Sequence, residues 1–283
     1  MALPVNSLDS AVQSLEDLEI ELLLTAIARY FGYDFRSYAK ASLRRRILCV
    51  VQEQGVETIS GLQEKLLHYP DLLRSFISTL SVHVTSLFRD PEFYISLREK
   101  VVPMLRTYPF VRVWVAGCAT GEEVYSLAIL LHEAGLDDRV RIYATDISDD
   151  LLERAKLGAF PLARMKLYTQ NYHRASGKRD FSSYYRVRGD SVYMDDALKK
   201  SLVFSQHNLA ADAAFNEFQL VFCRNVMIYF DQELRQRVHR LFYDSLSNFG
   251  VICLGLRESI RFTSVENHFE ALDDVQKIYR RTR

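Results

Sequence analysis

The stretch Val113–Ser126, "VWVAGCATGEEVYS", decides the fold. Its apolar β-branched start predicts a buried strand, its glycines predict a turn, and "EEVYS" predicts the start of a helix. Gly117 and Gly121 are spaced GxxxG, so the GxGxxG dinucleotide fingerprint is absent. A P-loop is also excluded, because no Lys-Ser or Lys-Thr pair follows the second glycine. The stretch therefore predicts a strand–turn–helix unit whose glycines let the backbone approach a ligand of another kind.

Two carboxylates stand at the start of this helix, where a phosphate would otherwise rest. At ~4 Å and an effective dielectric of ~20, a like pair of unit charges costs about 4 kcal/mol. Glu122 and Glu123 thus favour a phosphate-free cation such as S-adenosylmethionine. A second interpretation stays open for Glu123, because Thr120–Glu123 matches the S/T-x-x-E capping box.

An acidic residue closes the next predicted strand. Asp146 in "RIYATDIS" follows Gly121 at roughly the ~20-residue spacing of a ribose-binding carboxylate. It could instead cap the following helix, although Ser148 is available for that role. Turn, acidic strand end and strand–helix–strand context together indicate a class I methyltransferase.

The chain changes character after Asp90-Pro91. The first ~80 residues show helical periodicity, and later apolar runs alternate with helical segments, which predicts an α/β fold with a sheet buried on both faces. We expect a Rossmann-like mixed sheet in residues 86–283 and an all-helical N-terminal domain in residues 1–85. A small antiparallel β-subdomain is predicted as a hairpin at about 180–200, with a tight Gly189-Asp190 turn. The predicted strands are 111–117, 139–148, 201–209, 218–230, 250–256 and 275–282.

Bulk composition excludes several classes of protein. The 283 residues carry 36 basic and 36 acidic side chains, so global charge gives no argument for nucleic acid. No apolar run approaches ~18 residues, and the first residues lack a signal-peptide pattern, so we expect a cytoplasmic protein without membrane insertion. The four cysteines form no CxxC pair and are predicted to be buried free thiols. No metal is expected, because Leu136 replaces the second histidine of an HExxH motif.

Four stretches carry a specific resemblance: "TSLFRD" from Thr85, "AGCATGEEVYSLA" from Ala116, "YATDIS" from Tyr143 and "FCRNVMIYFD" from Phe222. Together they resemble the CheR family of chemotaxis-receptor glutamate methyltransferases over nearly the whole chain. The resemblance implies methyl transfer from S-adenosyl-L-methionine to glutamate side chains of methyl-accepting chemotaxis receptors in signal transduction. S-adenosyl-L-homocysteine would be the second product.

The resemblance also implies roles for individual residues. Arg89 and Tyr229 match the family positions nearest the transferred methyl group. Their alternatives are an ion pair of Arg89 with Asp90 or Glu92, and core packing of Tyr229. The implied cofactor-binding positions are His83, Thr85, Arg89, Gly117, Glu123, Asp146, Asn208, Leu209, Arg224 and Asn225.

A basic helix is implied to dock the acidic methylation helices of receptors. Here it carries Lys40 and Arg44, Arg45 and Arg46, although consecutive arginines point around a helix and some of them could simply face solvent. The tight hairpin turn predicts that no receptor C-terminal peptide tether is required.

Four positions depart from the common family pattern. His83 replaces an asparagine, Val124 replaces a proline, and Leu256-Arg257 replaces a His-Ser pair. The last departure bears on the substrate side of the site. Two alternatives to a receptor methyltransferase stay open: a non-catalytic S-adenosylmethionine-binding regulator, and a class I methyltransferase acting on another protein or on a small molecule. Retention of Arg89 and Tyr229 favours the receptor enzyme over the regulator.

Overall fold

The computed structural model describes residues 5–81 and 85–282, with side chains described from residue 15 onward. The chain divides into two compact units, one of Met1–Val82 with Tyr229–Leu234 and one of His83–Ile228 with Arg235–Arg283. We call them the helical unit and the sheet unit. The predicted domain ranges, 1–85 and 86–283, stay predictions.

Within residues 5–81, the helical unit has four helices, as the periodicity predicts. They are α1 (Val5–Phe31), α2 (Lys40–Glu53), α3 (Ile59–His68) and α4 (Pro70–Leu80). Each of α2 to α4 buries an apolar stripe, for example Leu43, Ile47 and Val50 on α2. The Thr58 hydroxyl caps α3 by accepting from the Gly61 amide at 3.0 Å. The apolar pattern predicts a fourth helix reaching Phe88, but α4 ends at Leu80.

The sheet unit is built on a seven-stranded mixed sheet in the order β6-β2-β1-β7-β8-β10-β9. The first five strands run parallel, and β10 lies antiparallel between β8 and β9. These strands are β1 (Val111–Ala116), β2 (Val140–Asp146), β6 (Leu202–Gln206), β7 (Phe218–Cys223), β8 (Leu246–Leu254), β9 (Phe269–Asp273) and β10 (Ile278–Arg281).

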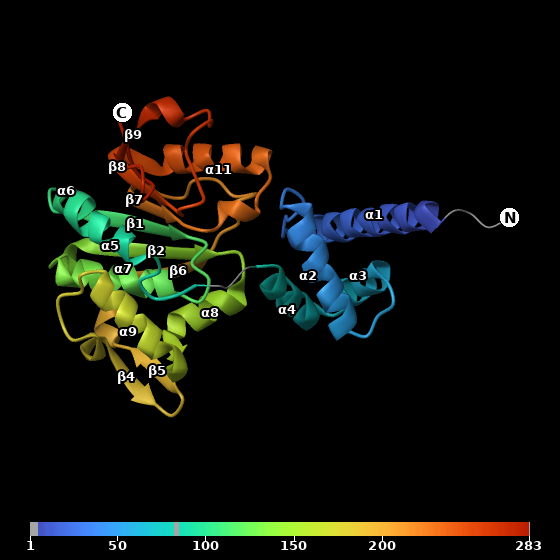
Figure 1. Cartoon of the computed structure of the whole chain (residues 1–283), viewed down its shortest axis with the longest axis horizontal. Helices are drawn as coiled ribbons and strands as arrows, with labels where there is room; N and C mark the ends of the chain where they lie inside the picture. Colours follow the sequence, from blue (N-terminus) through green and yellow to red (C-terminus); the bar gives the residue numbers. More distant parts are fainter. Residues whose placement is uncertain (1–4, 82–84, 283) are drawn as a thin grey trace. The chain divides into compact units, whose positions relative to one another are not determined.

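Helices cover both faces of this sheet, which explains its continuous apolar strands. Figure 1 shows α11 on one side of the sheet and α7 and α8 on the other. Every residue of β7 is buried, as expected for a central strand. The α-helices in the described part of the sheet unit are α5 (Pro91–Ser96), α6 (Val102–Leu105), α7 (Glu122–Glu133), α8 (Asp149–Leu157), α9 (Met165–Arg174), α10 (Asp196–Lys199) and α11 (Gln232–Ser245).

The class I methyltransferase architecture is confirmed, including the small antiparallel subdomain. Strand β5 (Ser191–Met194) pairs with β4 (Tyr185–Arg188) and with β3 (Ala159–Pro161), so the subdomain has three strands. The sequence pattern predicts the β4–β5 hairpin but not β3, β9 or α9. Strand β1 lies between β2 and β7, so the topological switch point falls at the carboxyl ends of β1 and β7.

Candidate functional site

The glycine turn after β1 has the predicted strand–turn–helix form. Gly117 and Gly121 adopt φ of +73° and +94°, which disfavour any side chain. An added Cβ at Gly117 would stand 2.5 Å from Val226 Cγ2, and one at Gly121 would stand 3.0 Å from Ala155 Cβ. The glycines are therefore needed for the close packing of the protein around the turn, whichever ligand the turn takes.

The predicted capping box does not form. Gly121 is the N-cap of α7, and no side chain caps the helix. The Thr120 hydroxyl instead donates to Glu122 Oε2 at 2.5 Å, within the same turn. Burial raises the pKa of the Glu122 carboxyl above its ordinary value, although the hydrogen bond from Thr120 opposes the shift. The capping interpretation of Glu123 is thus wrong, and its carboxylate is available for another contact.

Glu123 meets Arg224 across the switch point. Arg224 donates to Glu123 Oε1 at 2.6 Å and to Asp90 Oδ2 at 2.7 Å, and its side chain is 1% exposed. Its guanidinium carbon stands 3.9 Å from the centre of the Phe93 ring. Burial lowers the pKa of Arg224, but Glu123, Tyr94 and Asp90 more than offset this effect, so the net direction is upward. This cluster joins two predicted cofactor residues, Glu123 and Arg224.

The sequence does not reveal the role of Asp90 and Phe93 in this cluster. It suggests Asp90 only as a partner of Arg89 or as part of a helix start. The φ of 57° at Asp90 places it in the left-handed region at the N-cap of α5. No local sequence signal identifies an ion pair between residues 134 positions apart.

Asp146 lies at the end of β2 and is buried, with 7% of its surface exposed. Its Oδ2 accepts from the Ala119 amide at 2.9 Å and its Oδ1 from the Ser148 amide at 3.1 Å. Burial raises the pKa of the Asp146 carboxyl, and these backbone donors oppose the shift. The carboxylate thus ties the glycine turn to the start of α8, in the position predicted for a ribose-binding residue.

The predicted adenine-side pair follows β6. Asn208 and Leu209 are both buried, at 8% and 7% exposed. Asn208 Oδ1 accepts from the Ala210 amide at 2.9 Å, while its Nδ2 has no partner among the described residues. A buried amide donor is costly to leave without a partner, so this position calls for an acceptor such as a water molecule or a ligand atom.

The remaining predicted residues of the sheet unit lie on the segment before α5 and on the loop after β7. Thr85 and Arg89 are partly buried, and the Arg89 carbonyl accepts from Arg224 Nη1 at 3.5 Å. Asn225, directly after Arg224, has a φ of 61°. His83 lies outside the described residues.

Tyr229 belongs to the helical unit, unlike the other predicted site residues of the sheet edge. Its carbonyl accepts from the Ala39 amide at 2.7 Å, and the Arg46 guanidinium lies over its ring at 5.4 Å. The same guanidinium donates to the Leu80 carbonyl. Arg46, a predicted docking residue, therefore contacts the predicted catalytic tyrosine within the helical unit.

The other cations of α2 point in different directions. Arg44 pairs with Glu16 of α1, while Lys40 and Arg45 are exposed.

Cys49, on the same helix, is also exposed. The prediction of a buried thiol is wrong at Cys49, because the helix turns this position toward solvent. The other three free cysteines are buried.

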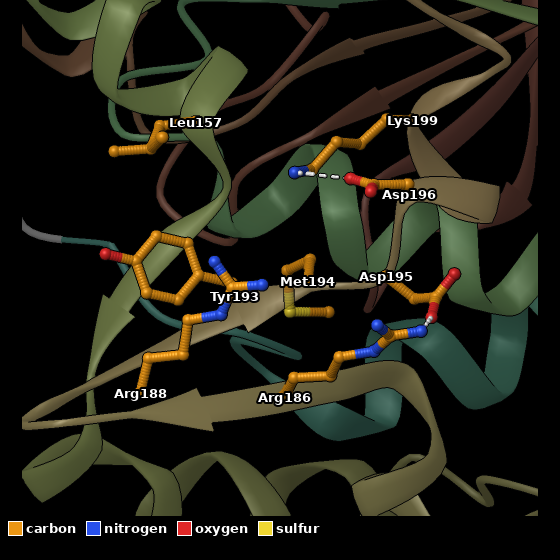
Figure 2. Close-up of a pocket in the computed structure, with 8 residues that line it drawn as sticks. All are labelled: Leu157, Arg186, Arg188, Tyr193, Met194, Asp195, Asp196 and Lys199. Carbon is orange, nitrogen blue, oxygen red and sulfur yellow. Dashed lines mark hydrogen bonds and ion pairs between the residues drawn. The ribbon is translucent and has the colours of Figure 1, made fainter.

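A separate pocket of about 230 Å³ lies on the β-subdomain. Figure 2 shows the Arg186 side chain directed toward Asp195 and the Lys199 ammonium directed toward Asp196, at 3.8 and 3.1 Å. None of the predicted site residues lines it. The lining residues are Leu157, Arg186, Arg188, Tyr193, Met194, Asp195, Asp196 and Lys199.

Two absences concern the described part of the chain. Within residues 5–81 and 85–282, no group of three or more His, Cys, Asp and Glu side chains is arranged to hold a metal ion. In the same ranges, no helix combines the length and apolar character needed to cross a bilayer.

Known proteins are similar to this chain over most of its length. Residues 83–278 match the family model "CheR methyltransferase, SAM binding domain", and residues 18–81 match "CheR methyltransferase, all-alpha domain". The chain is 45% identical over 266 residues to the "Putative methyltransferase Cher3" of Pseudomonas putida, covering 94% of this chain and 97% of that protein. It is 31% identical over 251 residues to the "Chemotaxis protein methyltransferase" of Listeria monocytogenes, covering 87% and 92% of the two chains. The chain therefore belongs to the CheR methyltransferase family.

Proposed function

We propose that this protein transfers the methyl group of S-adenosyl-L-methionine to glutamate side chains of methyl-accepting chemotaxis receptors. The products are glutamate methyl esters and S-adenosyl-L-homocysteine, and the reaction serves chemosensory adaptation in the cytoplasm. Family membership supports methyl transfer, and the names of the Listeria relatives support a role in chemotaxis. The observation that carries the proposal is the set of polar side chains at the carboxyl edge of the sheet: the ion pair of Glu123 with the buried Arg224, and the buried side chains of Asp146 and Asn208.

The chemistry of this cluster fits the cofactor. Asn208 Nδ2 and Arg224 Nε are buried donors without partners among the described residues. An adenine ring and an amino-acid carboxylate offer acceptors for such donors, and Asp146 and Glu123 are suited to a ribose hydroxyl and an ammonium group. Thr85, Arg89, Gly117, Leu209 and Asn225 would complete the cofactor site. When bound, S-adenosylmethionine supplies an electrophilic methyl group on a sulfonium cation.

The substrate nucleophile needs no general base. A glutamate side chain has a pKa near 4.3, so the attacking carboxylate is already ionised at neutral pH. The protein must instead orient this carboxylate and exclude water from it. We assign binding of the substrate carboxylate to the Arg89 guanidinium. The Tyr229 hydroxyl is assigned the role of orienting this carboxylate.

Receptor recognition is assigned to α2. Lys40 and Arg45 are exposed, so their positive charges can attract an acidic helix. Arg44 and Arg46 are also predicted to dock substrate, but they contact other groups of the helical unit. We propose that Lys40 and Arg45 provide most of the electrostatic attraction for the receptor.

No receptor tether is required in this proposal. Strand β4 is an edge strand of the β-subdomain, the type of site to which an extended peptide adds. Its connection to β5 is the tight turn at Gly189-Asp190, with Arg188 opposite Ser191. Calorimetry with an isolated receptor C-terminal peptide checks this point, and micromolar affinity would contradict it.

Tritiated methyl transfer to receptor cytoplasmic domains from the same organism tests the function. We expect base-labile label that disappears when the receptor glutamates are changed to alanine. Tight binding of S-adenosylhomocysteine without any transfer would contradict the proposal and favour a cofactor-binding regulator. Label on other proteins or on small molecules would favour a different substrate.

A further inference from the structure

Glu258 is a buried carboxylate at the same edge of the sheet, and sequence analysis gives it no role. It follows β8 by four residues and is 6% exposed. None of the ion pairs among the described residues includes it. Its charge is instead met by the backbone.

Four backbone amides donate to this carboxylate. Oε1 accepts from Val226 at 2.9 Å and from Met227 at 2.8 Å. Oε2 accepts from Asn225 at 2.8 Å and from Gly255 at 2.6 Å. Three of the four donors are consecutive residues of the loop after β7, so one side chain fixes the backbone of this part of the loop.

This arrangement requires an ionised side chain. Each oxygen accepts two N–H groups, which leaves no place for an acidic proton or for an amide NH₂ group. Burial raises the pKa of the Glu258 carboxyl, and the four backbone hydrogen bonds oppose that shift. Charge-assisted hydrogen bonds of this kind are stronger than neutral ones, so they can compensate for the cost of burial.

The loop that Glu258 holds is the one that carries two cofactor candidates, Arg224 and Asn225. It adopts a left-handed conformation at Asn225, with a φ of 61°, which the surrounding structure must stabilise. Val226 packs against Gly117 of the glycine turn, where an added Cβ would stand 2.5 Å from its side chain. Glu258 thus connects β8 to the loop after β7 and, through Val226, to the turn after β1.

Gly255 shows how close this contact is. An added Cβ would stand 2.7 Å from both the Asn225 nitrogen and Glu258 Oε2. Any side chain at this position would push the carboxylate and the loop apart.

We propose that Glu258 is a positioning residue, whose carboxylate fixes the backbone of Asn225–Met227 and thereby sets Arg224 and Asn225 against the cofactor. The inference rests on the proposed function for the identity of the cofactor, but it concerns cofactor binding alone. This role does not depend on the two residues before Glu258, where Leu256-Arg257 replaces the His-Ser pair of the common family pattern.

Glu258→Gln tests the proposal in the full chain, with S-adenosylhomocysteine binding measured by calorimetry. We expect affinity to fall by ~10- to 100-fold, because one carboxylate oxygen becomes an NH₂ group and two of the four backbone amides lose their acceptor. Glu133→Gln is the matched control. Its side chain is also buried and accepts from Arg98 and Tyr172, but it lies at the opposite end of α7 from the glycine turn. The control should lower the thermal midpoint and leave affinity within about twofold of wild type.

A double-mutant cycle separates positioning from general destabilisation. If Glu258 acts through the loop, its substitution should cost less affinity in an Asn225→Ala background than in the wild type. Equal costs in both backgrounds, or unchanged affinity in Glu258→Gln, would overturn the proposal.

Gly255→Ala provides a second route should Glu258→Gln not fold. This variant keeps the Glu258 side chain but pushes its carboxylate away from the Asn225 amide, so we expect the same loss of affinity with a native circular dichroism spectrum. Native affinity in a folded Gly255→Ala protein would also overturn the proposal. If the wild-type protein binds S-adenosylhomocysteine but does not methylate receptors, the proposed function is contradicted, while the positioning role of Glu258 is not.

Discussion

The two charged regions of this molecule solve different physical problems. At the carboxyl edge of the sheet, Arg224 is almost fully buried and contacts two carboxylates at 2.6 and 2.7 Å. On α2, the four predicted docking cations diverge, and two of them, Lys40 and Arg45, are exposed. A buried charge must keep its partners, whereas an exposed charge exchanges them with water and salt.

This difference in burial distinguishes two kinds of arginine that look alike in the sequence. Arg224 is part of the structure that would hold the cofactor, so its loss should affect stability and binding together. Arg45 contacts solvent, so its loss should affect only the encounter with a partner.

Arg224→Met should have the largest effect. It leaves the Glu123 and Asp90 carboxylates without their buried cation, which typically costs about 3–5 kcal/mol. We expect this loss in the free energy of unfolding measured by urea denaturation, together with loss of measurable S-adenosylhomocysteine binding.

The matched control for Arg224 is Arg174→Met. Arg174 also pairs with a carboxylate at 2.8 Å, that of Glu92, but both side chains are more than half exposed. Removing an exposed pair should change stability by less than ~1 kcal/mol. Similar losses in the two variants would show that burial does not distinguish these ion pairs.

Asp146→Ala should weaken cofactor binding by ~10- to 100-fold, the loss of one or two charge-assisted hydrogen bonds. Its neighbour Asp149 is exposed at the start of α8, so Asp149→Ala is the control and should bind normally. Calorimetric titration with S-adenosylhomocysteine measures both. Unchanged affinity in Asp146→Ala would remove this residue from the site.

Local patterns predict much of the sheet unit because strands and helices follow short-range periodicity. The run Val113–Ser126 folds as its apolar start, glycines and polar helix start predict. Asp146 lies at the end of a strand as predicted, since the apolar run "RIYAT" stops there.

Other features depend on distant partners and cannot be predicted locally. The apolar pattern predicts a strand over 218–230, but β7 ends at Cys223, and the amides of Asn225 and Val226 donate to Glu258 instead of to a neighbouring strand. The Glu123–Arg224 pair joins residues 101 positions apart, so no spacing rule identifies it. The basic run on α2 suggests one surface, but its members meet different neighbours once the helix packs.

The arginine run on α2 offers a direct comparison of neighbours. Arg45→Ala should raise the KM for a receptor fragment by ~2- to 5-fold with little change in kcat, and added salt should reduce the difference. Arg46→Ala should instead lower kcat and the thermal midpoint, because it removes the contacts with the Tyr229 ring and the Leu80 carbonyl. Steady-state kinetics at two salt concentrations measure both variants. Identical changes in the two proteins would show that α2 acts as one undivided surface.

The smallest effect should come from Glu122→Gln, and it should depend on pH. Burial raises the folded-state pKa of Glu122 above its ordinary value of 4.5. The folded protein therefore binds this proton more tightly than the unfolded chain does. The stability that this tighter proton binding contributes is fully present below pH 4.5, and it is lost as pH rises through the raised folded-state pKa of Glu122.

The glutamine side chain of this variant cannot titrate, so the variant should gain stability relative to wild type as pH rises from about 4 to about 7. Urea denaturation at several pH values measures this gain. A difference between the two proteins that does not change with pH would show that Glu122 titrates alike in the folded and unfolded chains. Burial at the start of α7 would then not disfavour the charge of the Glu122 carboxylate.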